Sequence, residues 1–352
     1  MRRAISGHVS FMDRLEKKKI AIVTDAWFPH VSGVAVTLRE TKKELEKLGH
    51  EVLIIGPSHF KFTIPLIGYP EIKLALFADK ALAKMLDEFA PDAIHISVDL
   101  GPLGLSARSY CVKRKLRFST AYHTRFPEYV NVRTGIPISW TYRYMKWFHG
   151  KASHTMVASE ILKKELESHG MKNLEIWNRG VDTELFNQNN PIDIQEERPI
   201  FMYMGRVAVE KNLEAFLKLD LPGTKYIVGD GPVRKHLESK YKDAVFTGYK
   251  FGEELASHLA AADVFVFPSK TDTLGLVMLE ANACGLPIAS FFSQASTSVV
   301  ENGVNGILSD DLKEACLGAL KLSKEKAREY ALKHGWEEPT KLFLNNLVLA
   351  KG

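Results

Sequence analysis

Residues 268–287 read PSKTDTLGLVMLEANACGLP and contain the end of a strand, a loop and a whole helix. The apolar run at 263–267, just before them, is typical of a buried β-strand. The run LVMLEANAC has the apolar pattern of a helix, and the Gly-Leu-Pro after it is a typical helix stop. Strand, loop and helix in this order form the repeating unit of a parallel sheet that is covered by helices. The stretch therefore predicts an α/β fold.

Two acidic residues of this stretch are spaced for a long ligand. Asp272 is expected in the loop where the strand ends, and Glu280 about two turns into the helix. Eight residues of helix span about 12 Å, too far for both acids to share one proton or one metal ion. The first helical turn has unpaired N–H groups and the positive end of the helix dipole, and Gly275 lets a ligand approach closely. A phosphate between the two acids is favoured; a capped surface helix with two solvated acids is the alternative.

The stretch resembles the acid-x7-acid motif of the retaining glycosyltransferases of family 4, which have the GT-B fold. The resemblance implies that Asp272 holds the donor hexose and that Glu280 holds the ribose of the nucleotide. The family usually has Glu and Phe at the positions of Asp272 and Leu274. The resemblance also places backbone groups against the sugar and the diphosphate, namely those of Thr273, Leu274, Gly275 and Leu276.

Strand-like and helix-like patterns alternate on both sides of this stretch. A polar connection near 179–199 separates two such series, which predicts two doubly wound, Rossmann-like domains facing across a cleft. Ligands of such folds bind at the carboxyl ends of the strands. The expected strands are 19–24, 51–55, 92–96, 117–122, 154–158 and 174–177 in the first series, and 200–204, 225–228, 244–246, 263–267 and 288–291 in the second.

These patterns set the expected domain boundaries. Residues 19–180 form an N-terminal, acceptor-binding domain, and residues 181–335 form a C-terminal domain that binds the nucleotide sugar. Residues 1–18 are a tail. The resemblance adds that the C-terminal helix, residues 336–352, crosses back onto the first domain.

A pair of basic residues follows the first strand of the second series, in the sequence MGRVAVEKNL. A guanidinium group such as that of Arg206 clamps two oxygens at once, and the ammonium group of Lys211 supplies a compact charge. The segment, which begins at Gly205 after the strand, matches the family pattern Gly-Arg…Glu-Lys-Asn. The resemblance implies that both cations stabilise the diphosphate as it leaves. We expect no metal and no cofactor, with a UDP- or GDP-hexose as co-substrate.

Two glycine-containing turns precede helices elsewhere in the chain. Gly229 and Gly231 in VGDGP allow a tight turn, which is usually structural; the resemblance places this turn beside the nucleotide. In VSGVAVTL, Gly33 with the N–H groups of Val34 and Ala35 is predicted to cap the diphosphate, with simple packing as the alternative.

A histidine ends a strand in the sequence AYHTRFPEY. A lone histidine is more often structural than catalytic, but family members carry His in a similar Tyr-His-Thr setting. The resemblance therefore implies that His123 contacts the sugar or positions the acceptor. Together with Arg206, Lys211 and Asp272, it completes the catalytic candidates.

Composition excludes several classes of protein. The 352 residues, 45% hydrophobic and 25% charged, are typical of a soluble two-domain protein. We find neither a secretory signal nor a nucleic-acid-binding motif, and three widely spaced cysteines favour a reducing cytoplasm. Residues 1–180 hold 28 Lys or Arg against 18 Asp or Glu, which suits an anionic partner or simple solubility. The aromatic and basic residues at 140–154 lie at a membrane surface, or the aromatics are core.

The predicted function is the cytoplasmic transfer of a hexose from a nucleotide sugar to a hydroxyl acceptor. The sequence looks most like bacterial glycolipid synthases and mannosyltransferases, which implies a lipid or membrane-displayed glycan as acceptor and possible peripheral association with the inner face of the membrane. By resemblance, transfer retains configuration by a front-face route in which the leaving phosphate takes the acceptor's proton. A GT-B epimerase would need more acids and histidines, and an NAD-dependent oxidoreductase would need a G-x-G-x-x-G turn. A sugar-binding protein without catalysis does not explain Arg206 and Lys211.

Overall fold

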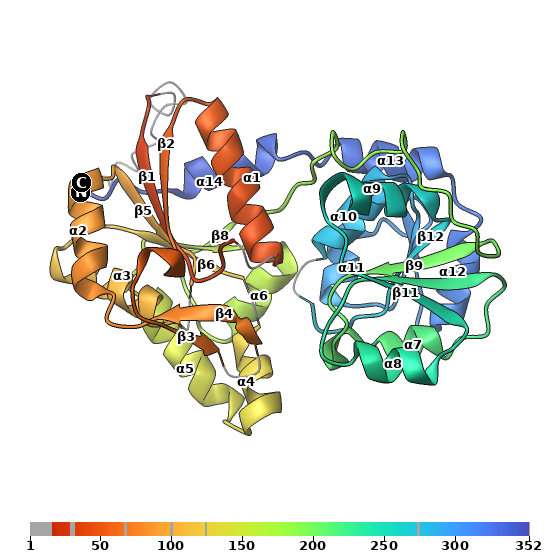
Figure 1. Cartoon of the computed structure of the whole chain (residues 1–352). Coiled ribbons are helices and arrows are strands. Elements are labelled where there is room, and N and C mark those ends of the chain that lie inside the picture. Colours follow the sequence, from red (N-terminus) through yellow and green to blue (C-terminus); the bar gives the residue numbers. More distant parts are fainter. Residues whose placement is uncertain are drawn as a thin grey trace. The chain divides into compact units, whose positions relative to one another are not determined.

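A computed structural model gives the fold and describes residues 16–28, 32–66, 69–98, 101–123, 125–272 and 275–351. The chain divides into two compact units (Figure 1). Unit 1 consists of the chain up to Asn178 together with the segment that starts at Glu337, and unit 2 is Arg179–Trp336. Each unit has its own parallel sheet with helices on both faces.

The sheet of unit 1 has six parallel strands in the order β2-β1-β5-β6-β7-β8. The strands are β1 (Lys19–Val23), β2 (Glu51–Ile55), β5 (Ala93–Ile96), β6 (Ser119–Tyr122), β7 (His154–Val157) and β8 (Leu174–Ile176). The helices are α1 (Gly33–Lys47), α2 (Asp79–Phe89), α3 (Pro102–Lys113), α4 (Phe126–Thr134), α5 (Ile138–His149), α6 (Glu160–Ser168) and α14 (Glu337–Asn346).

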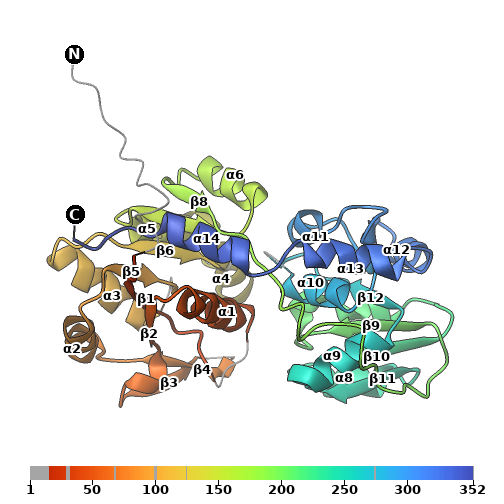
Figure 2. The same ribbon diagram turned by 90° about the horizontal axis from the view of Figure 1, so that it is seen from above.

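Alternate residues of β1 build the two faces of this sheet. Ile20 and Ile22 pack in one cluster with Leu38 of α1 and Phe343 of α14. Ala21 and Val23, which point the other way because strand side chains alternate, belong to a second cluster with residues of α2 and α3. Figure 2 shows α14, in blue, lying beside α1, in red. A strand buried on both faces is a continuous apolar run, which is why this sheet is recognisable in the sequence.

A small antiparallel hairpin in unit 1 was not predicted. β3 (Thr63–Leu66) pairs with β4 (Tyr69–Ala75), and a short 3-10 turn, η2 (Pro57–His59), precedes them. Pro65 and Pro70 lie within these strands. Proline removes a hydrogen-bond donor and argues against a strand, so the sequence pattern hid this pair.

Unit 2 has six parallel strands in the order β11-β10-β9-β12-β13-β14. They are β9 (Ile200–Met204), β10 (Thr224–Val228), β11 (Ala244–Gly248), β12 (Val264–Phe267), β13 (Ile288–Ser290) and β14 (Gly306–Leu308). The helical segments are η3 (Val209–Lys211), α7 (Leu213–Leu217), α8 (Arg234–Lys240), α9 (Gly252–Ala261), α10 (Leu276–Ala283), α11 (Gln294–Val299), α12 (Leu312–Ala319) and α13 (Lys324–Leu332).

Strand order fixes where each unit can bind a ligand. In unit 1 the chain leaves β1 for β2 on one side and later places β5 on the other, so the order reverses between β1 and β5. In unit 2 the same reversal lies between β9 and β12. A doubly wound sheet opens a crevice at the carboxyl ends of the two strands that flank such a switch point.

Candidate functional site

The switch point of unit 2 brings together the two strongest sequence motifs. The loop after β9 ends in η3 with Lys211, and the loop after β12 carries Asp272. Lys211 Nζ lies 2.5 Å from Asp272 Oδ1, and the two side chains are 25% and 21% exposed. This half-buried ion pair joins residues that are far apart in the sequence, because β9 pairs with β12.

Backbone contacts hold the two loops together around the ion pair. Asn212 Nδ2 donates to Pro268 O at 3.1 Å, and the Thr271 hydroxyl donates to Glu210 O at 3.3 Å. Arg206 is half-buried in the same loop after β9, and its carbonyl accepts from the Tyr203 hydroxyl at 2.9 Å. Both predicted cations therefore lie on one fixed loop.

Gly205, Gly229 and Gly231 pack two loops backbone against backbone. A Cβ on Gly229 would lie 1.9 Å from Gly205 O, and one on Gly231 would lie 2.3 Å from Val207 O. Gly205 and Gly229 also have φ values of +145° and +148°, which side chains rarely adopt. These glycines are therefore required for packing between the loops after β9 and β10. Asp230 in the same turn pairs with Arg234 at 2.8 Å, a structural role.

The helix after Asp272 starts at the residue expected from the sequence. α10 begins at Leu276 with Gly275 at its N-cap, so Glu280 lies in the second turn and not two turns in. Gly275 is buried, and a Cβ there would lie 2.5 Å from Met278 Cε, so the flexible Met278 side chain would have to move. Glu280 is half-buried. The predicted contacts of Thr273 and Leu274 lie outside the described residues.

The remaining predicted site residues lie at the carboxyl edge of the sheet of unit 1. His123 follows β6, and its Nε2 lies 2.6 Å from Ser97 Oγ, which follows β5. Its ring packs against Trp177 at 5.7 Å between ring centroids. Gly33 and Val34 start α1, whose N-cap Ser32 accepts from Ala35 N–H at 3.2 Å. The contact of the Ala35 N–H with phosphate stays a prediction; in this structure that N–H donates to the cap.

One residue of this edge was missed from the sequence. Asp25 follows β1 by two positions, is 8% exposed, and has both carboxylate oxygens buried without a hydrogen-bond partner in the described parts of the chain. Burial raises its pKa to about 7. The sequence shows only an acidic residue shortly after an apolar strand. That pattern does not reveal whether the carboxyl group has a hydrogen-bond partner in the fold.

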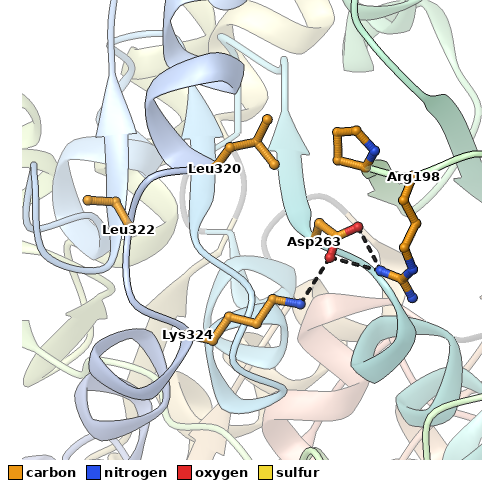
Figure 3. A pocket seen from close by; sticks show the side chains of 6 residues that line it. Arg198, Asp263, Leu320, Leu322 and Lys324 are labelled. Atoms are coloured by element: carbon orange, nitrogen blue, oxygen red, sulfur yellow. Dashed lines mark hydrogen bonds and ion pairs between the residues drawn. The ribbon is translucent and has the colours of Figure 1, made fainter.

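A surface pocket in unit 2 is structural and separate from these residues. Figure 3 shows Arg198 and Lys324 pointing toward Asp263. Asp263 accepts from Arg198 at 2.7 and 2.8 Å, from Lys324 at 3.2 Å and from Ile200 N–H at 2.8 Å. Burial alone would raise the pKa of Asp263, but the Ile200 hydrogen bond and the charges of Lys324 and Arg198 lower it. The pocket lies at the amino ends of β9 and β12, opposite the switch point.

The described residues lack two features that other functions would need. They contain no group of three His, Cys, Asp or Glu side chains placed to hold a metal ion. No helix among them has the length and apolar character that a membrane crossing needs. Cys111, Cys284 and Cys316 are buried and free.

α5 divides its aromatic residues between core and surface. Tyr142 and Phe148 are buried, whereas Trp140 is 69% and Trp147 52% exposed. Of the two alternatives drawn from the sequence, the core position holds for Tyr142 and Phe148, and the surface position holds for Trp140 and Trp147.

Comparison with known proteins identifies two family models along the chain. The model described as Glycosyltransferase Family 4 matches residues 31–185, and the one described as Glycosyl transferases group 1 matches residues 198–323. Among solved structures, sucrose-phosphate synthase from Thermosynechococcus elongatus aligns with a TM-score of 0.74 and 18% identity, over 93% of this chain and 97% of that chain. That similarity supports the GT-B fold.

Curated relatives carry related activities. A GDP-mannose-dependent alpha-mannosyltransferase of Corynebacterium glutamicum is 28% identical over 86% of this chain and 80% of its own length. A sulfoquinovosyl transferase of Arabidopsis thaliana is 31% identical over 78% of this chain and 59% of its own length. An alpha-monoglucosyldiacylglycerol synthase of Streptococcus pneumoniae is 26% identical over 86% of this chain and 78% of its own length. The chain thus belongs to glycosyltransferase family 4 and is a nucleotide-sugar-dependent glycosyltransferase of the GT-B fold.

Proposed function

We propose that the protein moves a hexose from UDP- or GDP-hexose to a hydroxyl group of a lipid or a membrane-displayed glycan, with retention of configuration. The observation that carries the proposal is the Lys211–Asp272 pair across the switch point of unit 2. It places a fixed cation beside an acid where a doubly wound sheet binds its ligand.

The ion pair suggests how the donor binds. Without a ligand, the Lys211 ammonium is neutralised by Asp272. A bound diphosphate offers Lys211 a stronger anionic partner, and the carboxylate of Asp272 then accepts hydrogen bonds from hexose hydroxyls. Glu280 binds the ribose. The fixed charges of Lys211 and Arg206 stabilise the negative charge that grows on the leaving nucleotide, so transfer proceeds without a metal ion.

The acceptor side of the reaction is assigned to unit 1. His123, held by Ser97, contacts the sugar or positions the acceptor. Gly33 and Val34 offer first-turn N–H groups to the diphosphate. In the front-face route, the leaving phosphate takes the proton of the acceptor hydroxyl. The names of the relatives, which include glucosyldiacylglycerol synthases from two bacteria, support a lipid acceptor.

A lipid acceptor requires contact with a membrane surface, and α5 provides a suitable face. Trp140 and Trp147 are exposed on the helix together with Arg143 and Lys146. Trp147 is held by Arg108, whose guanidinium lies 4.0 Å from the ring centroid. Exposed aromatic and basic residues on one helix are typical of peripheral binding to anionic lipid. We assign this face to reversible membrane contact.

Nucleotide release from sugar nucleotides tests the enzymatic proposal. UDP-glucose, UDP-galactose and GDP-mannose are incubated with and without dioleoylglycerol micelles, in buffer with EDTA, and the configuration of any product is read by NMR. Acceptor-stimulated release from one donor and a retained anomeric configuration are expected. Lys211→Met should lower turnover by at least ~100-fold. The control Lys218→Met removes an exposed lysine of the same unit and should leave turnover unchanged. Equal rates for both variants would remove Lys211 from the mechanism.

Vesicle flotation tests the membrane assignment. The wild type should float with phosphatidylglycerol vesicles and remain unbound with phosphatidylcholine vesicles. Replacing Trp140 and Trp147 together by Ser should abolish flotation. Phe251→Ser removes a comparably exposed aromatic, 58% exposed, from unit 2 and serves as control. Flotation that survives the double substitution contradicts the assignment.

A further inference from the structure

We propose that Asp25 is an acceptor-binding residue, whose carboxyl group hydrogen-bonds a neutral hydroxyl of the acceptor at the switch point of unit 1. The inference rests on the proposed function and deepens it. It adds a third strand end to the acceptor site, beside those that carry Ser97 and His123.

Asp25 lies where the fold of unit 1 opens its crevice. β1 and β5 are paired up to Val23 and Ile96, and the pairing continues because Ser97 N–H donates to Val23 O at 2.8 Å. The Thr24 hydroxyl also reaches Ser97 O, at 3.4 Å. Asp25 therefore follows one strand of the switch point, and Ser97 follows the other.

Within the described parts of the chain, the Asp25 side chain has no hydrogen-bond partner that would explain its burial. Both oxygens are buried, and the described residues supply no hydrogen bond to either. A buried carboxyl without a partner destabilises a fold, because the group gives up its bonds to water. Since burial holds the pKa of Asp25 at about 7, a large fraction of the group is protonated near neutral pH. A protonated carboxyl both donates and accepts hydrogen bonds, as a hydroxyl ligand does.

Gly101 provides independent evidence that the chain keeps room for this carboxyl. A Cβ on Gly101 would lie 1.6 Å from Asp25 Oδ2. The backbone of Gly101 has φ −80° and ψ 152°, which any residue adopts, so its conformation does not require glycine. The absent side chain is explained by the position of the Asp25 carboxyl group.

The neighbouring strand end connects Asp25 to the acceptor. Ser97 is hydrogen-bonded at 2.6 Å to His123, the residue assigned to the sugar or the acceptor. Ser97, His123 and Asp25 thus line three successive strand ends, those of β5, β6 and β1. A carboxyl group repels phosphate, so the part of the acceptor that reaches Asp25 is an uncharged alcohol, such as the free hydroxyl of a glycerolipid or a sugar.

Steady-state kinetics of full-length variants test the inference, with dioleoylglycerol as the acceptor and the donor that the wild type uses. Asp25→Leu, which is similar in size but has no hydrogen-bonding group, should raise the acceptor KM by at least ~10-fold, as expected for one lost hydrogen bond. The donor KM and the acceptor-free release of nucleotide should change by less than about twofold, since Asp25 is not among the residues proposed to contact the donor. A purely structural role would move the two KM values together.

A second variant keeps the test decisive if Asp25→Leu does not fold, as judged by thermal melting. Asp25→Asn keeps an oxygen acceptor and the shape of the side chain, and should raise the acceptor KM by a smaller factor. An unchanged acceptor KM in a folded variant overturns the assignment of Asp25. A wild type that releases no nucleotide from any donor overturns the proposed function as well, so the two failures are distinct.

Discussion

Replacing Asp25 by Asn is expected to make unit 1 more stable than the wild type, and increasingly so as the pH rises. Burial raises the pKa of Asp25 from its ordinary value of 3.8 to about 7. Between these values the unfolded chain loses the proton and the folded chain keeps it. The folded state then binds more protons, so the free energy of unfolding falls with rising pH until about pH 7.

The size of the effect follows from the same two pKa values. Each pH unit of the window corresponds to about 1.4 kcal/mol, which gives about 4 kcal/mol in total and about 3 kcal/mol between pH 5 and pH 8. Asn has no such titration. The difference in stability between Asp25→Asn and wild type should therefore increase by about 3 kcal/mol over that range.

Urea unfolding at pH 5 and pH 8, followed by tryptophan fluorescence, measures this difference. Trp177 is fully buried in unit 1 and reports its unfolding. The pKa of the buried His149 is lowered to about 3 by burial, but that histidine is present in both proteins and cancels in the comparison. Parallel pH dependence of the two proteins would show that Asp25 is not a buried, unpartnered acid, and the reasoning would fail.

Three further substitutions test the packing. Gly229→Ala should lower stability by about 3 kcal/mol or more, as seen in thermal melting, because its Cβ would strike Gly205 O. Phe343→Ala should cost unit 1 about 3–5 kcal/mol in urea unfolding, since the buried ring packs 4.8 Å from the Trp177 ring. Asp263→Asn should lower the free energy of unfolding by about 1–3 kcal/mol, seen as a lower melting temperature, and leave the donor KM unchanged. A raised donor KM would mean that the pocket of Figure 3 serves the donor.

The parallel sheets were predictable because their strands are buried on both faces. A run such as KIAIV at β1 alternates between two cores and so is apolar throughout. The α/β fold class and the division into two domains follow from the alternation of such runs with helices, whereas the GT-B architecture was expected from the motif resemblance. The hairpin β3–β4 was missed because Pro65 and Pro70 contradict the usual strand pattern.

The sequence names candidate site residues, but it does not reveal the contacts between them. The motif resemblance singled out Lys211 and Asp272 for separate tasks. Their ion pair depends on β9 lying next to β12, a strand order that periodicity in the sequence does not reveal. Asp25 was not predicted for a similar reason. Whether its carboxyl group finds a hydrogen-bond partner among the described residues depends on the three-dimensional structure.

The return of α14 to unit 1 has a consequence for biosynthesis. Unit 2 is one continuous segment, whereas unit 1 is completed only by residues after Glu337, among them the buried Phe343. On the ribosome, unit 2 is therefore the first unit whose whole sequence has been translated, although its segment begins after most of unit 1. The nascent N-terminal half must wait, with the apolar surface that Phe343 will cover still open, until the last stretch of the chain emerges.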